Sequence, residues 1–207
     1  MKTHTPTPEQ MATRVARFGT LKPVNAQYDA ADGIPAEAYR TISANGTYIL
    51  MGPAGLSSAT GESPPVVGGD GGEVFTVNIA KCPPGNGSPL HAHQYTHETF
   101  FCLNGRFEVK WGDKGEHSIV LEPMDMIAVP PGVVRNFTNI TDKEADLLVF
   151  IQGDRDRFRD VDFPAEMGRT IEQKFGPKVR RLMENKGLVF TAGEDVSLPI
   201  DARKAAE

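Results

Sequence analysis

The sequence has few cysteines and no long apolar run, and each absence excludes a class of protein. Only Cys82 and Cys102 occur among its 207 residues, and no CxxC pair is present. A disulfide framework or a thiolate zinc site needs more cysteines at close spacing, so we expect two reduced, buried thiols. No stretch is long and apolar enough for a transmembrane helix, and the segment after Met1 is polar where a signal peptide would be apolar. We therefore expect a cytoplasmic protein.

The chain also lacks an excess of positive charge, since its net charge is −5. Nucleic acids and anionic membranes are recognised first through accumulated Lys and Arg. We therefore expect a small-molecule substrate as the partner, with no nucleic acid and no membrane. The charged fraction of 24% and the hydrophobic fraction of 39% are those of a folded globular protein, and the length suits one domain.

What is present predicts an all-β protein with short helices at both ends. Thr7 to Gln10 predicts a helix start, with Thr as the cap, Pro in the first helical position and Gln three residues after the cap. Repeated Pro and Gly between 53 and 72 predict a loop or arm. Residues 177–186 predict a C-terminal helix that Gly187 terminates.

Between the two ends, residues 75–79 and 107–111 alternate apolar and polar side chains, which is typical of half-buried strands. Further short strands are predicted around 117–121, 125–129, 133–139 and 145–151, separated by Gly, Pro and Asp turns. No helix pattern separates them, so we expect an antiparallel barrel or sandwich, and the lack of an internal repeat favours one barrel. We divide the chain into an N-terminal helix and arm (1–45), a β-barrel domain (46–153) and a C-terminal helical extension (154–207).

A candidate metal site lies between residues 84 and 105. His91 and His93 are two residues apart, so on a strand their side chains project from one face. Glu98 follows after four residues that can form a turn, so two imidazoles and one carboxylate can converge. With open coordination positions, this ligand set suits catalytic divalent iron, and also nickel, manganese, copper or zinc. We expect one divalent metal ion per chain, with iron as the first choice.

These residues resemble the first motif of the cupin family. That motif is Gly, five residues, His-x-His, three or four residues, Glu, six residues and Gly, and its fixed positions are filled by Gly85, His91, His93, Glu98 and Gly105. The resemblance implies an antiparallel double-stranded β-helix, or jelly-roll barrel, with the metal inside its wider mouth. It does not imply one reaction, because cupins include dioxygenases, isomerases, cyclases, lyases and binding proteins.

The second cupin motif is matched only in part. Pro130, Gly132 and Asn139 agree with it, but Met124 stands where glycine is usual, and Arg135 stands where a fourth ligand, histidine, is expected. A guanidinium group stays protonated and offers only donors, so Arg135 cannot bind a metal. Its strand position, taken with the resemblance, predicts a side chain that points into the barrel.

A buried Arg135 needs a negative partner, and two alternatives are open. It can pair with Glu98 and draw that carboxylate from the metal. It can instead bind an anionic substrate, such as a carboxylate, enolate or phenolate, beside the metal. We follow the second interpretation, which makes Glu98 and Arg135 the candidate catalytic residues and Arg135 a substrate-binding residue.

Three further side chains near the motifs have alternative roles. Phe100 and Phe137 are candidate substrate-binding residues, although aromatic residues in strands more often belong to the core. His97 should point away from the ligand face of a regular strand, whereas a β-bulge would make it a spare ligand. A histidine pair that binds no metal remains the alternative to the metal site itself.

The resemblance favours a non-haem metal dioxygenase, similar to single-barrel cupins that cleave flavonols, diketones or aromatic acids. Few protein ligands leave room for both substrate and dioxygen. The alternatives are a non-redox cyclase, isomerase or lyase, in which the metal polarises a carbonyl, and a binding cupin without turnover. We expect a homodimer, because an exposed sheet edge can pair with a second chain and because cupins commonly associate through strands and terminal extensions.

Overall fold

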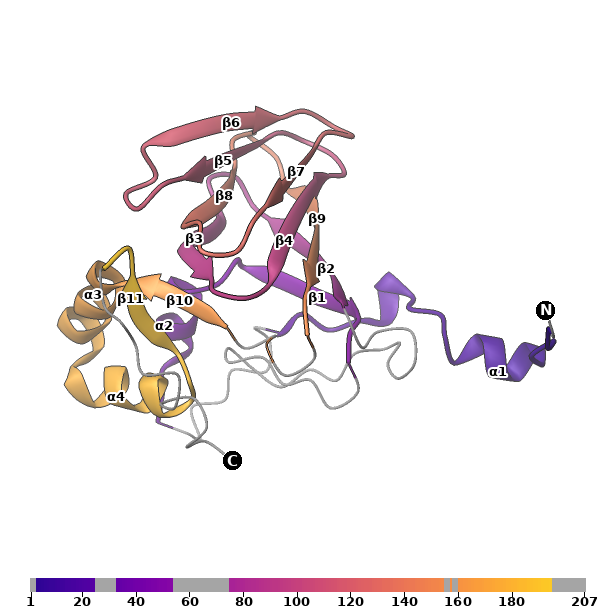
Figure 1. The fold of residues 1–207 in the computed structure, drawn as a ribbon, viewed down its shortest axis with the longest axis horizontal. Coiled ribbons are helices and arrows are strands. Elements are labelled where there is room, and N and C mark those ends of the chain that lie inside the picture. The colour runs from indigo at the N-terminus through magenta and orange to yellow at the C-terminus, as the bar shows by residue number, and fades with distance from the viewer. Residues whose placement is uncertain (1–2, 25–32, 54–74, 155–156, 158–159, 195–207) are drawn as a thin grey trace.

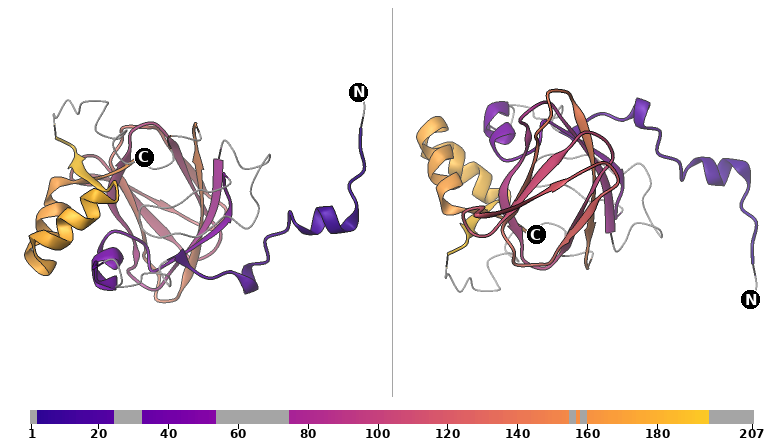
Figure 2. Two further views of the ribbon diagram at one scale, coloured as in Figure 1. Left: turned by 90° about the horizontal axis from the view of Figure 1, so that it is seen from below. Right: turned by 90° about the horizontal axis from the view of Figure 1, so that it is seen from above.

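The computed structural model describes residues 3–24, 33–53, 75–154, 157 and 160–194. They form two facing β-sheets, a helical layer on one side and an N-terminal arm on the other (Figures 1 and 2). The sheets have five and six strands. Strand pairing is antiparallel throughout, except between β10 (Val161–Pro164) and β11 (Val189–Ala192). The predicted all-β jelly-roll class is confirmed. The loop predicted between 53 and 72 lies, apart from residue 53, outside the described residues.

Six of the eleven described strands coincide closely with the strand segments predicted from the sequence. In the order in which they pair, the strands of the first sheet are β1 (Gly46–Met51), β2 (Phe75–Cys82), β9 (Ala145–Gln152), β4 (His97–Cys102) and β7 (Met126–Val129). Those of the second sheet are β11, β10, β3 (Gly87–His93), β8 (Arg135–Asn139), β5 (Phe107–Trp111) and β6 (His117–Leu121). In β2 and β8, buried residues alternate with half-buried ones. This alternation points one set of side chains into the space between the sheets.

The core between the sheets is aromatic and aliphatic, with two thiols. Phe100, Phe107 and Phe137 belong to it, as do Cys82 and Cys102. Both cysteines are buried and free, as predicted.

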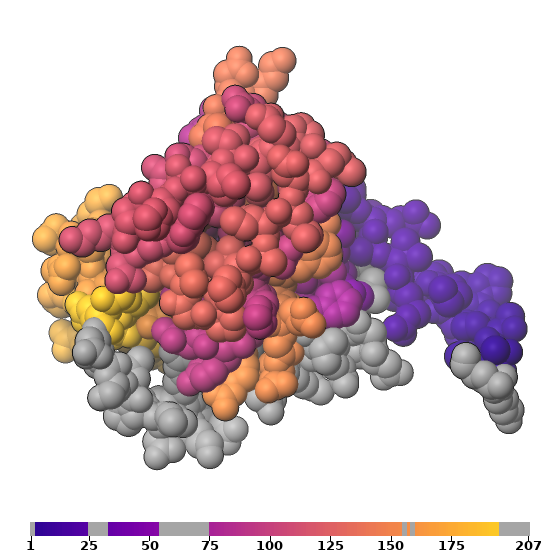
Figure 3. All heavy atoms as spheres, turned by 45° about the horizontal axis from the view of Figure 1, so that its top comes forward, coloured from indigo at the N-terminus to yellow at the C-terminus, as the bar shows by residue number. Residues whose placement is uncertain are grey.

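The helices lie outside the barrel. They are α1 (Pro8–Ala12), the 3-10 helix η1 (Phe18–Thr20), α2 (Ala36–Thr41), α3 (Ala165–Phe175) and α4 (Pro177–Asn185). The predicted capping box of Thr7 and Gln10 is present at α1, and the N-terminal arm stands clear of the barrel in Figure 3. Helix α4 ends before Gly187, whose φ of 88° terminates it, as predicted. Among the described residues, no helix is long and apolar enough to cross a membrane.

A second apolar core joins α2 to the C-terminal elements, which the sequence did not reveal. Ile34 and Tyr39 from the N-terminal side pack with Phe163, Ile171 and Met183 from the C-terminal side. Helix α3 escaped prediction because the sequence after Gly153 is rich in charge, and only Gly168 and Ile171 are buried within this helix. This second core holds β10 against the edge of β3.

Two glycines of the first motif have backbone conformations that other residues rarely adopt. Gly85 has a φ of 72° and Gly105 a φ of 69°, and a Cβ at 105 would lie 2.5 Å from the Cβ of Ala145. Met124, at a glycine position of the second motif, has a φ of 77° and is the single non-glycine residue with positive φ in the described part of the chain. The backbone at 124 therefore keeps a conformation that favours glycine, and Met124 adopts it under strain.

Candidate metal centre

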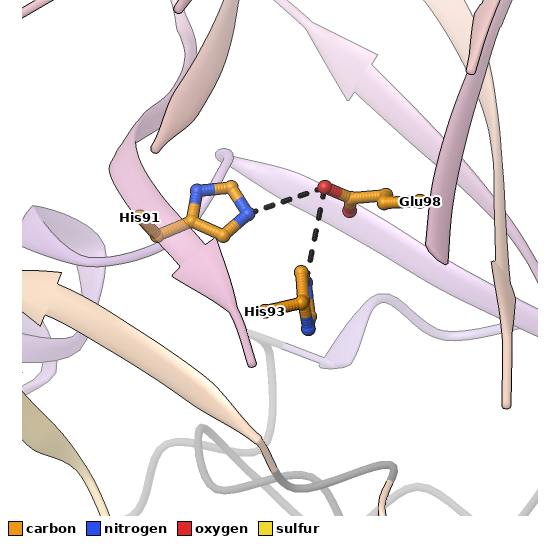
Figure 4. Close-up of side chains that lie close together, drawn as sticks. All are labelled: His91, His93 and Glu98. Atoms are coloured by element: carbon orange, nitrogen blue, oxygen red, sulfur yellow. Dashed lines mark ion pairs between the residues drawn. The ribbon is translucent and has the colours of Figure 1, made fainter. Parts of the chain in front are cut away.

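His91, His93 and Glu98 converge inside the barrel, as Figure 4 shows. The histidines project from one face of β3, and Glu98 reaches them from β4 in the opposite sheet. Glu98 Oε2 lies 3.3 Å from His91 Nε2 and 3.8 Å from His93 Nε2. All three side chains are buried, and their ligand atoms lie within 4.8 Å of one another. Within the described residues they are the one group of three or more His, Cys, Asp or Glu residues placed to hold a metal ion.

The packing of β3 explains why its end is both buried and well positioned. This strand lies between β8 and β10, and residues 91–93 are all buried. Ala92 points to the other face of the sheet, where it packs with Val134 and Ala192. The two histidines are therefore held on the inner face by neighbours on both sides of the strand.

Each imidazole also has a hydrogen-bond acceptor at its second nitrogen. His91 Nδ1 lies 2.8 Å from the carbonyl oxygen of Pro89, and His93 Nδ1 lies 2.8 Å from Asp160 Oδ1. Because an oxygen acceptor at Nδ1 requires a proton there, the Nε2 lone pairs are left to face Glu98 when the rings are neutral. This is the tautomer that a metal ligand needs.

Arg135 points into the barrel, as predicted, and is fully buried. Its Nε donates to Glu98 Oε2 at 2.9 Å and its Nη1 donates to the carbonyl oxygen of Val133 at 3.0 Å. We expected Arg135 to bind a substrate and not Glu98, and this contact corrects that expectation: Arg135 pairs with Glu98. A buried guanidinium takes the carboxylate within reach, because leaving both charges uncompensated would cost several kcal/mol. Nη2 is buried and has no hydrogen-bond partner among the described residues.

The pKa values follow from these contacts. Burial alone would raise the pKa of Glu98, but the Arg135 guanidinium and the two imidazoles hold it well below its usual value. Burial lowers the pKa of His91, and Glu98 offsets that shift only in part. Burial would also lower the pKa of His93, but Glu98 and Asp160 together raise it. The protein thus keeps Glu98 ionised, the state in which a carboxylate binds a metal.

The donor set fits a divalent metal ion. Two ligand atoms that each lie about 2.1 Å from one ion are roughly 3.0 to 3.5 Å apart at right-angled or tetrahedral positions. The observed 3.3 and 3.8 Å separations need only small adjustments to reach that range. Arg135 competes for Glu98, yet a carboxylate has enough lone pairs to accept a hydrogen bond and bind a cation at once.

The other predicted residues take different places. Phe100 and Phe137 are buried in the core with their ring centroids 5.1 Å apart, and their contact with a substrate stays a prediction. His97 is exposed on β4, whose pairing has no register shift, so it is not part of the ligand group.

Sequence reasoning missed Asp160, which is buried beside His93. It lies in a charged stretch, where an aspartate usually indicates a solvated surface. The one available signal was Asp160 and Asp162 alternating with Val161 and Phe163, a period of two that suits a short strand.

Residues 78–151 match the family model described as Cupin domain. No curated protein matches the sequence.

Three solved structures illustrate the similarity. A sugar phosphate isomerase from a cupin superfamily of Silicibacter pomeroyi is 33% identical over 40% of this chain and 52% of its own, with a TM-score of 0.35. The Cnp3 cupin domain of Schizosaccharomyces pombe is 20% identical over 39% of this chain and 57% of its own (TM-score 0.36). A predicted oxalate decarboxylase of Thermotoga maritima is 18% identical over 39% and 68% (TM-score 0.36). The match thus spans little more than half of the first two chains, and TM-scores this low say nothing about activity.

Proposed function

We propose, on the premise that residues 78–151 form a cupin domain, that this protein is a metal-dependent enzyme, and that its reaction is the dioxygenation of a small anionic organic molecule. The observation that carries the proposal is the convergence of His91 Nε2, His93 Nε2 and Glu98 Oε2, with both Nδ1 atoms hydrogen-bonded elsewhere. Iron is the metal we expect first, with nickel, manganese, copper and zinc as alternatives.

A divalent metal held by three protein ligands supplies a Lewis acid with open positions, and iron adds redox chemistry with dioxygen. The protein supplies the surroundings. Arg135 occupies the place of a fourth ligand and cannot bind the metal, so it leaves a further position open. Its unpartnered Nη2 is a donor for an anionic substrate, while Nε keeps its bond to Glu98.

These contacts reconcile the two alternatives for Arg135. One guanidinium group has several N–H donors in a planar fork, so it can hold Glu98 with one edge and a substrate oxygen with another. A substrate that bears a carboxylate, enolate or phenolate would be oriented beside the metal by this bond. Phe100 and Phe137 stay candidate contacts for an aromatic substrate.

The first experiment is elemental analysis of protein purified under mild conditions. Wild-type protein should carry stoichiometric divalent metal, and the double variant His91→Ala/His93→Ala should carry none. His97→Ala is the matched control, because His97 belongs to the same segment but is exposed, and it should keep the metal. Equal metal content in the double variant and the wild type would show that the site is wrong.

Dioxygen uptake then tests the reaction class. The iron-loaded protein should consume dioxygen only when a suitable enolisable or aromatic acid is present. Turnover of such an acid without dioxygen, and with zinc or nickel in place of iron, would show a non-redox cyclase, isomerase or lyase instead. Tight binding with the ligand released unchanged would show a binding protein.

A further inference from the structure

Asp160 connects the C-terminal part of the chain to the metal centre. It is 2% exposed and lies beyond the matched cupin domain. Oδ1 accepts the hydrogen bond from His93 Nδ1 at 2.8 Å. Oδ2 accepts the backbone N–H groups of Tyr95 at 2.7 Å and Thr96 at 2.8 Å, and Thr96 Oγ1 donates to the same carboxylate. One buried carboxylate therefore contacts a candidate ligand and the turn that follows it.

That turn determines how far apart the candidate ligands lie. Residues 94–96 connect β3, which ends at His93, to β4, which begins one residue before Glu98. Two backbone N–H groups of this turn bond to Asp160, so its shape depends on a side chain from outside the β3–β4 unit. The carboxylate thus constrains both the ring of His93 and the chain that leads to Glu98.

The position of Asp160 is itself fixed by packing. It immediately precedes β10, which pairs antiparallel with β3 and brings Val161 opposite His93. Phe163 of the same strand is buried in the second apolar core, and its ring centroid lies 6.2 Å from that of His91. The helical layer therefore holds β10, and with it Asp160, against the site.

We propose that Asp160 is a positioning residue for the metal. It accepts the Nδ1 proton of His93 and so keeps Nε2 free as the ligand atom, and it holds the 94–96 turn that sets the distance to Glu98. This inference rests on the proposed metal site, but the tautomer of His93 can be observed without a metal. Acceptors of this kind are worth about 10- to 100-fold in metal affinity.

Asp162 provides a matched control two residues away. It is 1% exposed and its carboxylate accepts hydrogen bonds from Thr191 N, Thr191 Oγ1 and Ala192 N at 2.8, 2.9 and 3.1 Å. Its remaining bond is a 3.4 Å contact from Gln94. Asp162 thus resembles Asp160 in burial, charge and hydrogen bonding, but it does not contact a candidate ligand.

The experiment compares the wild type with Asp160→Asn and Asp162→Asn. An asparagine at 160 must direct its oxygen toward the N–H groups of Tyr95 and Thr96, so its NH₂ group faces His93. His93 Nδ1 then becomes an acceptor, and the proton moves to Nε2. Ring ¹⁵N chemical shifts of the metal-free protein at alkaline pH report which nitrogen carries the proton. Chelator competition reports the metal affinity.

In wild type and Asp162→Asn, His93 should carry its proton on Nδ1, and the two proteins should share one metal affinity. Asp160→Asn should carry it on Nε2 and bind metal about 10- to 100-fold more weakly. An equal loss of affinity in Asp162→Asn, or an Nε2 proton in the wild type, would overturn the proposal. The wild-type spectrum decides this second point even if Asp160→Asn fails to fold. If wild-type protein carries the proton on His93 Nδ1 but binds no metal, the proposed metal site is wrong. The hydrogen bond from His93 to Asp160 would still be supported.

Discussion

The buried pair between Glu98 and Arg135 gives the most quantitative prediction. Arg135 is fully buried and Glu98 is 4% exposed, and their contact of 2.9 Å neutralises both charges. Replacing Glu98 with Gln keeps the shape of the side chain but removes its charge. The guanidinium is then buried without a counter-charge, which costs about 3 to 5 kcal/mol.

This cost should appear as a large fall in the stability of the metal-free protein. For a chain of this size, 1 kcal/mol corresponds to roughly 2 to 4 °C in Tm, so Glu98→Gln should lower Tm by about 6 to 20 °C. Arg135→Met should also destabilise the protein, but less, because Glu98 keeps its contacts with His91 and His93. The double variant should lose much less than the sum of the two, because neither buried charge remains.

Urea unfolding with a chelator present measures all four proteins. Glu122→Gln is the control, because its ion pair with Arg106 has a similar length of 2.8 Å but both side chains are more than half exposed. That substitution should change stability by less than about 1 kcal/mol. The reasoning would be refuted if the single variants lost no more unfolding free energy than this control. It would also be refuted if the loss in the double variant equalled the sum of the two single losses.

The stability lost in Glu98→Gln should depend on pH. The pKa of Glu98 lies well below its usual value of 4.5, because Arg135 and the histidines outweigh the effect of burial. Its stabilisation is therefore complete above the unfolded-state pKa and is lost as the pH falls through the lower folded-state pKa. The difference in unfolding free energy between the wild type and Glu98→Gln should be greatest near neutral pH and should become smaller in acid.

Three further predictions use other parts of the chain. Met124→Gly should raise the unfolding free energy by about 0.5 to 1 kcal/mol, because it removes left-handed strain at an exposed position. Burial raises the pKa of the Cys82 thiol to about 12, and it also raises the pKa of the Cys102 thiol. A thiol reagent at mildly alkaline pH should therefore label neither residue until the protein unfolds. Rapid labelling of the native protein would contradict this prediction. We also propose a homodimer, so light scattering should give about twice the 22.5 kDa chain mass, and a constant monomer mass at all concentrations would exclude it.

The barrel could be predicted from the sequence because its strands obey local rules. Phe107, Val109 and Trp111 alternate with charged residues, and β5 occupies these positions. The spacing of His91, His93 and Glu98 likewise places the ligands on two consecutive strands joined by a short turn, an arrangement in which they can converge. The inward direction of Arg135 followed from its strand phase together with the resemblance to the second cupin motif.

Contacts between distant segments could not be predicted. Asp160 bonds to a histidine 67 residues earlier in the chain, and neither motif includes that aspartate. The choice of Arg135 between Glu98 and a substrate depended on distances that spacing cannot supply. The second apolar core joins Tyr39 to Met183, and no pattern within either helix identifies the other as its partner.

The charges at the centre support the proposal of an anionic substrate. Glu98 and Arg135 cancel one another, and Asp160 contributes one further negative charge beside His93. With both imidazoles neutral, a divalent ion would leave this buried region with one excess positive charge. Uncompensated charge is costly away from water, so a monoanion is favoured next to the metal. Arg135 Nη2, the donor that lacks a partner, lies on the guanidinium that already bonds to Glu98, where such an anion would bind.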